Sequence, residues 1–241
     1  MAGLQAVGDN LWLISGPVVR AYGLPFPTRM AVVRLEDGGL WLWSPVHLDE
    51  GVRREIASLG EPCYAVEPNK LHHLALAEWA AEWPALRLYA PPGLAKKRAD
   101  LRFAASLVDE APLEWRGQID QVLVEGNLWM TEVLFFHRSS STCLVGDLIQ
   151  RHEDESLTTL QRWVMKVGGV FGPDGGTPRD ARLSFFHRAR AREAISRALS
   201  WAPRRLVIAH GTCAMGDGAD LLCRSFRWLL GPGNDDSVHE G

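Results

Sequence analysis

The feature that most constrains the fold is an alternation of short apolar runs with helical patterns in the first half of the chain. Strand-like runs occupy 40–43, 63–66 and 86–90, and the apolar spacing of amphipathic helices occupies 49–59 and 73–83. A β-α-β-α-β order requires right-handed crossovers and a sheet with helices on its face. We therefore predict an α/β protein.

Hairpins and further helices complete the expected architecture. The strands 30–35 and 40–43 flank the turn Asp37-Gly38-Gly39, and the strands 132–136 and 142–145 flank a serine-rich turn. Apolar spacing also predicts strands and helices elsewhere: strands at 11–14, 121–124 and 206–209, and helices at 157–167, 185–201 and 219–230. Residues 91–118 are polar and bounded by prolines, and we expect a surface excursion with a short helix that could serve as a lid.

Composition limits the classes of function. The 241 residues carry a net charge of −3, so nucleic-acid binding is not expected. No apolar run approaches the ~18 residues needed to span a membrane, and the N-terminus does not have the pattern of a signal peptide. The four cysteines form no C-x-x-C pair, which favours buried thiols in the cytoplasm. We expect one domain over 1–232 and a polar tail over 233–241.

Possible metal ligands follow three of the expected strands. They are the pair His72 and His73, then Asp147, then His210. Imidazole and carboxylate groups from separate strand ends form a plausible first shell for Zn²⁺ or Fe. Ordinary structural roles stay open for each of them: polar residues at a helix start for the histidine pair, an N-cap for Asp147 and a core histidine for His210.

These residues lie in motifs that resemble a known family. Leu40-Trp-Leu-Trp-Ser-Pro45, the His72-His73 segment, Cys143-Leu-Val-Gly-Asp147 and Val207-Ile-Ala-His-Gly211 resemble the metallo-β-lactamase superfamily. The runs Asn69-Lys-Leu-His-His-Leu74 and Leu88-Tyr-Ala-Pro-Pro-Gly-Leu94 are similar to its DUF4336 branch. The resemblance covers about residues 8–230. It implies an αββα four-layer sandwich with a metal site where strand-end loops meet.

The chain departs from the family motif His-x-His-x-Asp-His. With His73 as the last histidine, Pro68 and Lys70 occupy the first two histidine positions, and His72 occupies the aspartate position. The middle histidine ligand, expected near 125–127, is also missing. The resemblance then implies a single ion held by His72, His73, Asp147 and His210, with zinc favoured over iron. A site that has lost its metal is the alternative.

In this interpretation His72 and Asp147 are the candidate catalytic residues. The family's usual carboxylate base is absent, so water activated by the ion, or His72 when it is not a ligand, would act as the base. His47 and Lys70 are candidates for substrate binding. We expect His137 to be solvated in a turn and His187 to be structural, and Ser139–Ser141 has no nucleophile motif.

These residues and the resemblance lead to two hypotheses about function, from different classes. The first is a mononuclear metal-dependent hydrolase, in which water attacks an ester, thioester, lactone or phosphoester of a small molecule. The second is a catalytically inactive binding or interaction module with a degenerate metal site. Iron-based redox chemistry is a third possible function. The sequence also leaves open whether the chain forms a homodimer.

Overall fold

The computed structural model describes residues 3–21, 23–153 and 157–231, which group into two compact units. The first unit comprises residues 3–120 and 138–140, and the second comprises 121–137 and 141–231, in both cases without the undescribed positions. The sequence-based prediction of one domain over 1–232 stays a prediction. The expected tail, 233–241, lies outside the described residues.

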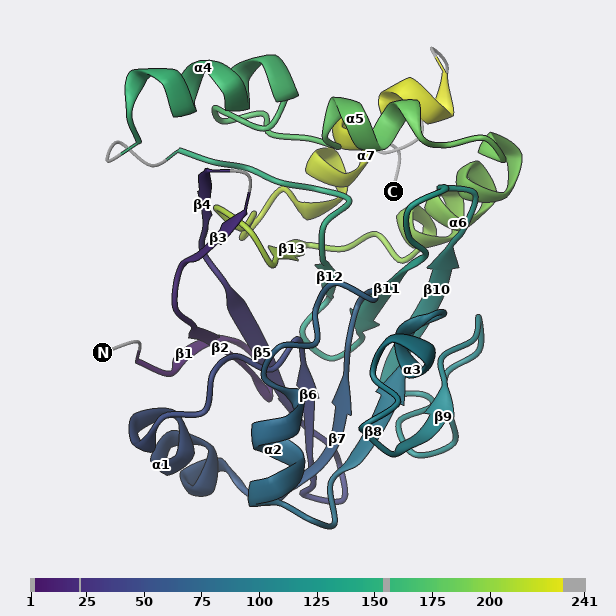
Figure 1. Ribbon diagram of the computed structural model, residues 1–241. Coiled ribbons are helices and arrows are strands. Elements are labelled where there is room, and N and C mark those ends of the chain that lie inside the picture. The colour runs from purple at the N-terminus through teal and green to yellow at the C-terminus, as the bar shows by residue number, and fades with distance from the viewer. Residues whose placement is uncertain (1–2, 22, 154–156, 232–241) are drawn as a thin grey trace. The chain divides into compact units, whose positions relative to one another are not determined.

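A seven-stranded sheet forms the frame of the first unit, in the order β1-β2-β5-β6-β7-β8-β9 (Figure 1). Its strands are β1 (Gln5–Gly8), β2 (Leu11–Ser15), β5 (Arg29–Arg34), β6 (Leu40–Trp43), β7 (Pro62–Val66), β8 (Arg87–Ala90) and β9 (Phe103–Ser106). The strands from β1 to β6 pair antiparallel, and those from β6 to β9 pair parallel. The short strands β3 (Val19–Ala21) and β4 (Leu24–Phe26) form a separate hairpin.

Helices cover one face of this sheet. They are α1 (Glu50–Leu59), α2 (Leu76–Glu82) and α3 (Leu94–Lys97). Buried side chains of α1 and α2, including Ile56, Leu76 and Trp79, pack against Leu42 and Ala65 of the strands in one apolar cluster. The predicted β-α-β-α-β order is therefore confirmed.

The ends of α1 follow from its sequence. The Asp49 carboxylate accepts a hydrogen bond from the Val52 N–H at 2.8 Å, which caps the N-terminus. Gly60, with φ +153°, caps the C-terminus of α1, and its N–H donates to the Ile56 carbonyl.

Two sequence-based expectations for the first unit are wrong. The helix expected from residue 73 begins at Leu76, so His72 and His73 lie in the preceding loop. The segment 91–118 is more than a surface excursion, because it contains β9, which extends the sheet. It also contains Trp115, whose buried ring packs edge-on against Tyr89 at 4.7 Å between centroids.

The second unit has a four-stranded sheet in the order β10-β11-β12-β13. Its elements are β10 (Ile119–Val124), β11 (Glu132–His137), β12 (Thr142–Val145), α4 (Thr159–Gly168), α5 (Arg179–Leu183), α6 (Arg188–Ser200), β13 (Arg205–Ile208) and α7 (Gly218–Leu230). β11 and β12 form the predicted antiparallel hairpin, and β12 pairs parallel with β13. α5 was not predicted, because its five residues are too few to show a helical period.

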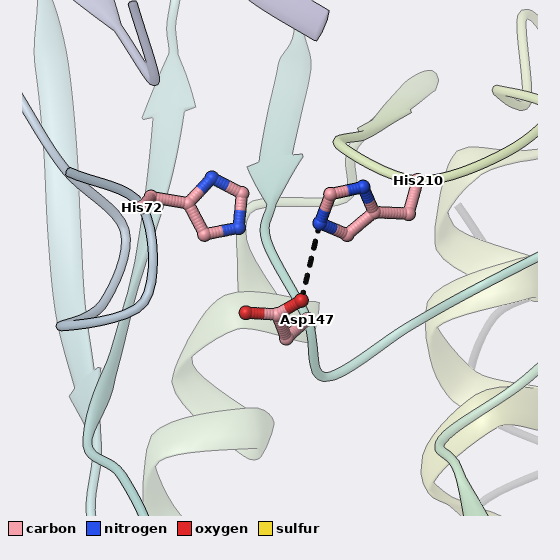
Figure 2. Close-up of side chains that lie close together, drawn as sticks. All are labelled: His72, Asp147 and His210. Carbon is pink, nitrogen blue, oxygen red and sulfur yellow. Dashed lines mark ion pairs between the residues drawn. The ribbon is translucent and has the colours of Figure 1, made fainter. Parts of the chain in front are cut away.

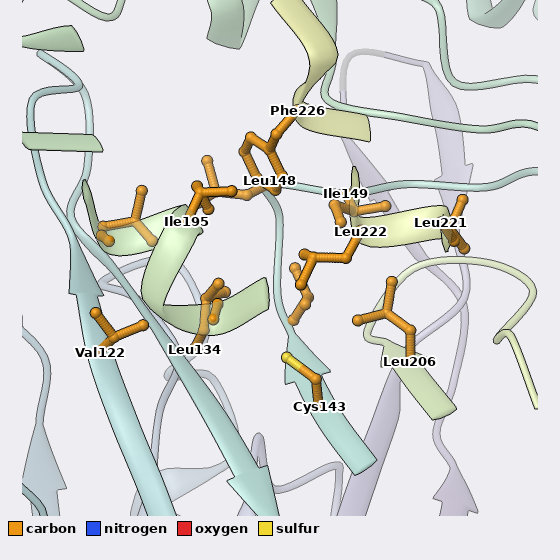
Figure 3. Packing of buried hydrophobic residues seen from close by; sticks show 14 of the residues in the cluster. Val122, Leu134, Cys143, Leu148, Ile149, Ile195, Leu206, Leu221, Leu222 and Phe226 are labelled. Carbon is orange, nitrogen blue, oxygen red and sulfur yellow. The ribbon is translucent and has the colours of Figure 1, made fainter. Parts of the chain in front are cut away.

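The core of this unit lies between its sheet and the helices α6 and α7. Figure 3 shows Leu134, Cys143 and Leu206 of the strands with Ile195 of α6 and Phe226 of α7, all buried in one cluster. Among the residues that the structure describes, no helix combines the length and the apolar character needed to cross a membrane.

Candidate metal centre

Asp147 and His210 lie at one edge of the second unit's sheet. β12 and β13 run parallel with Val145 opposite Ile208, so the residues that follow the two strands emerge side by side. The Nε2 atom of His210 is 3.2 Å from the Oδ1 atom of Asp147, as the dashed line in Figure 2 marks. Both side chains are largely buried. The structure thus brings together two of the predicted ligands.

Glu132 holds the loop that carries Asp147. This carboxylate is fully buried at the start of β11 and accepts the backbone N–H groups of Gly146 at 2.9 Å and Asp147 at 2.7 Å. The N–H of Leu148 lies 3.3 Å from the same carboxylate. A charged acceptor makes strong hydrogen bonds to backbone donors, so Glu132 fixes the turn after β12. The sequence analysis missed this residue, although a glutamate that opens an otherwise apolar strand is an unusual signal.

The loop after β13 is held by close contact with the backbone of Arg151. Gly211 has φ +121°, and a Cβ atom at this position would lie 2.1 Å from the Arg151 carbonyl oxygen. The Thr212 N–H donates to the same carbonyl at 2.7 Å. Only glycine fits here, so the His-Gly sequence sets the direction in which the chain leaves His210.

His72 belongs to the first unit and is oriented by Ser44. The two residues follow β7 and β6, which are adjacent parallel strands. The Oγ atom of Ser44 is 2.7 Å from Nδ1 of His72, and Ser44 has the left-handed φ of +52°. When Nδ1 carries the proton, the hydrogen bond to Ser44 leaves the Nε2 lone pair available to a metal ion. Ser44 is a second residue that the sequence analysis missed.

His73 has different surroundings from its neighbour. Nη1 of Arg98 lies 3.4 Å from the His73 Nδ1 atom and also donates to the His73 carbonyl at 2.8 Å. Burial, followed by the positive charges of Lys97 and Arg98, lowers the pKa of the His73 imidazole. Two nearby cations disfavour a metal ion at this ring, because like charges repel. The metal role assigned to His73 stays a prediction that these surroundings do not favour.

The two candidates for substrate binding also lie in the first unit. Nδ1 of His47 is 2.9 Å from Oε2 of Glu78, in a hydrogen bond between exposed side chains. The Lys70 carbonyl accepts a hydrogen bond from Nζ of Lys97 at 3.1 Å. Their roles toward a substrate stay predictions.

The structure also places His137, His187 and the expected middle-ligand position. His137, predicted to be solvated in a turn, is the last residue of β11 and is buried, so that prediction is wrong. His187 is exposed at the N-terminus of α6. At 125–127, Asn127 has a structural role: its Oδ1 atom accepts the Trp129 N–H at 2.8 Å.

Glu67 is a buried carboxylic acid that the sequence analysis did not single out. It follows β7 and is 1% exposed, and its Oε2 atom has no hydrogen-bond partner among the described residues. Burial raises the pKa of this carboxyl well above its ordinary value of 4.5, because a charged group loses its hydration there. Burial therefore favours the neutral form of Glu67.

Comparison with solved structures finds similar architectures. The metallo-β-lactamase from Pontibacter korlensis matches with a TM-score of 0.63 at 13% identity, over 96% of this chain and 100% of that one. The metallo-β-lactamase FIM-1 from Pseudomonas aeruginosa, in a mono-zinc form, matches with a TM-score of 0.62 at 12% identity, over 96% and 97%. The metal-soaked Flv1 flavodiiron core from Synechocystis sp. PCC6803 matches with a TM-score of 0.61 at 9% identity, over 95% and 60%.

Sequence comparisons do not identify a family for the chain. No family model matches the chain, and no curated protein matches it. At these identities the structural likeness concerns the fold alone, and it confirms the predicted α/β fold of metallo-β-lactamase type. The resemblance to the DUF4336 branch stays a prediction.

Proposed function

We propose, from the metallo-β-lactamase fold of this chain and the Asp147–His210 pair, that the protein is a mononuclear metal-dependent hydrolase. The observation that carries the proposal is the placement of this pair at the ends of β12 and β13, with the Asp147 loop held by Glu132. His72 supplies the third ligand in this proposal. Each of the three side chains offers one ligand atom to a metal ion.

The donor set fits a catalytic metal. Two imidazoles and one carboxylate match the three protein ligands of hydrolytic zinc sites, and also the two-histidine, one-carboxylate sites of non-haem iron. When bound, such an ion supplies Lewis-acid chemistry: it lowers the pKa of water and polarises a carbonyl or phosphoryl oxygen. Zinc is the proposed ion and iron the alternative, and the neighbours include both a mono-zinc lactamase and a metal-soaked flavodiiron core.

The chain's own residues have distinct roles in this proposal. Ser44 orients His72 and Glu132 fixes Asp147, so the donors are held before any ligand binds. Asp147 keeps a carboxylate oxygen beside the Nε2 atom of His210, so the two side chains can offer ligand atoms to the same ion. His72 is the base that takes a proton when it is not a ligand. The substrate proposed is an ester, thioester, lactone or phosphoester of a small molecule, in the cytoplasm.

A second function is favoured by the residues at the lost ligand positions. Pro68 and Lys70 occupy two positions where the family motif has histidines, and His73 faces Arg98. A chain that has lost these ligands could use the fold as a binding or interaction module without a metal. This alternative belongs to a different class and predicts no bound ion.

Metal analysis of protein purified without added metal separates the two functions. For the enzyme, we expect about one zinc or iron per chain, and a loss of most of it in His72→Ala, Asp147→Ala and His210→Ala. His187→Ala is the matched control, because His187 is an exposed histidine at the start of α6. His73→Ala tests the larger ligand set and is expected to keep the metal.

Activity assays complete the test. The metal-loaded protein is assayed with p-nitrophenyl acetate, a thioester, a lactone and bis-p-nitrophenyl phosphate, before and after chelation. Hydrolysis that chelation abolishes and zinc or iron restores supports the hydrolase. A chain that binds no metal at micromolar concentrations and hydrolyses none of these would leave the binding module as the function.

A further inference from the structure

Four large apolar side chains of the second unit are exposed on two neighbouring segments. Leu128 and Trp129 belong to the connection between β10 and β11, and Leu183 and Phe186 lie at and after the end of α5. Each is between 66% and 79% exposed. We call these four residues the apolar rim. Contiguous exposed apolar side chains mark binding surfaces more often than isolated ones do.

The two segments are tied together by their backbones. The Leu128 N–H donates to the Ser184 carbonyl at 3.0 Å, and the Phe186 N–H donates to the Gly126 carbonyl at 2.9 Å. Asn127 adds a side-chain hydrogen bond to the Ala181 carbonyl at 3.3 Å. The backbone that carries the rim is thus held by the fold, which lowers the cost of ordering the rim around a ligand.

The rim lies at the same sheet edge as the proposed metal centre. The connection that carries Leu128 and Trp129 ends at Glu132, whose carboxylate binds the backbone of Gly146 and Asp147. Trp129 is three residues before Glu132, and three residues of chain reach at most about 11 Å. A molecule bound at Asp147 is therefore within reach of the Trp129 side chain.

The chemistry of the rim identifies the group that it contacts. Residues 126–131 and 183–186 contain no Asp, Glu, Lys or Arg, so these segments offer no charge to a phosphate, a nucleic acid or an anionic membrane. Four side chains expose roughly several hundred Å² at most, less than the ~800 Å² per partner of a typical stable protein interface. A small, uncharged apolar group fits both observations.

We infer that the apolar rim binds the hydrophobic part of the substrate, and that the hydrolase acts on esters or thioesters with a long alkyl or aromatic acyl group. This inference rests on the proposed function, since it names the substrate class of the same site. The rim would select the acyl group of the substrate, and the metal centre would carry out the hydrolysis. Burying one methylene raises affinity about fourfold, so a chain of several methylenes provides strong selection.

The test compares p-nitrophenyl esters from acetate to decanoate with the metal-loaded protein. We expect kcat/KM to rise with chain length in the wild type. Trp129→Ser and Phe186→Ser should each lower the ratio of the decanoate kcat/KM to the acetate kcat/KM at least tenfold. Trp163→Ser is the matched control, because Trp163 is also an exposed tryptophan but lies on α4, outside the rim. Unchanged decanoate hydrolysis in both rim variants would overturn the inference.

A binding measurement separates this inference from the proposed function. If no ester is hydrolysed, the proposed activity fails, and titration of decanoate by calorimetry still tests the rim. Binding that weakens at least tenfold in Trp129→Ser but not in Trp163→Ser supports the rim as an acyl site, and no binding to the wild type overturns it. A dimer in sedimentation that Trp129→Ser dissociates would also overturn it, because a second copy would then cover the rim.

Discussion

The carboxylate of Glu132 accepts the backbone N–H of Asp147 at 2.7 Å, so a buried charge on one strand fixes a proposed ligand on the next. The contact spans the start of β11 and the end of β12, which the hairpin register brings to the same edge. Burying a carboxylate raises the free energy of the folded state unless the group is hydrogen-bonded, and backbone N–H groups donate to Glu132 here. The structural role of Glu132 is therefore testable apart from any activity.

Glu132→Gln should lower the free energy of unfolding by about 2 kcal/mol. The amide keeps the size of the side chain, but its NH₂ group cannot accept, so a backbone N–H loses a charged partner. Urea denaturation followed by circular dichroism measures the change. The control is Glu125→Gln in the same unit, where the partly exposed pair with Arg190 should contribute less than about 0.5 kcal/mol. Equal stability of Glu132→Gln and wild type would contradict this role.

Ser44→Ala should weaken metal binding at least tenfold, since it removes the group that orients His72. The backbone strain at φ +52° is similar for serine and alanine, so the substitution isolates the hydrogen bond. Competition with a zinc chelator gives the affinity. Ser58→Ala on the exposed face of α1 removes a local hydroxyl contact and should leave the affinity unchanged. A wild-type affinity in Ser44→Ala would show that His72 is held by other contacts.

Gly211→Ala should destabilise the protein by about 3 kcal/mol or more. The new methyl group would meet the Arg151 carbonyl, and the positive φ is itself unfavourable for alanine. Gly216→Ala in the same loop is the control, because nothing lies within 4 Å of its added Cβ atom. Thermal unfolding of the two variants measures the difference. Similar melting temperatures would mean that the backbone at 211 relaxes at little cost.

The pH dependence of stability should change in Glu67→Gln. Burial raises the folded-state pKa of Glu67, so its contribution is fully present below about pH 4.5 and is lost as the pH rises toward the folded pKa. Within that window the free energy of unfolding falls as the pH rises, because the unfolded chain ionises first. The neutral glutamine removes this loss.

Urea denaturation at pH 5, 6.5 and 8 tests this expectation. Glu67→Gln should gain stability relative to wild type as the pH increases. Glu61→Gln serves as the control, because Glu61 is exposed just before β7. A constant difference between Glu67→Gln and wild type across the three pH values would mean that Glu67 does not titrate in the folded protein as burial implies.

Local patterns were sufficient for most of the fold. The alternation over 40–90 and the turn at Asp37–Gly39 each specify a backbone geometry through short-range physics, and these elements are present. The start of α2 was placed three residues too early, because Leu74 fits a helical period yet lies exposed in the loop. β9 was missed because Phe103–Ser106 has only four residues and none that is β-branched, so it does not indicate a strand without its partner β8.

The sequence by itself determined the residue types that could bind a metal and the strand ends at which they lie, because strand periodicity and turn chemistry are local. Only the tertiary structure decided that His210 meets Asp147, that Glu132 holds the Asp147 backbone and that His73 faces Arg98. These contacts join residues 15 to 63 positions apart, and such pairings depend on strand register and packing, which no local pattern encodes.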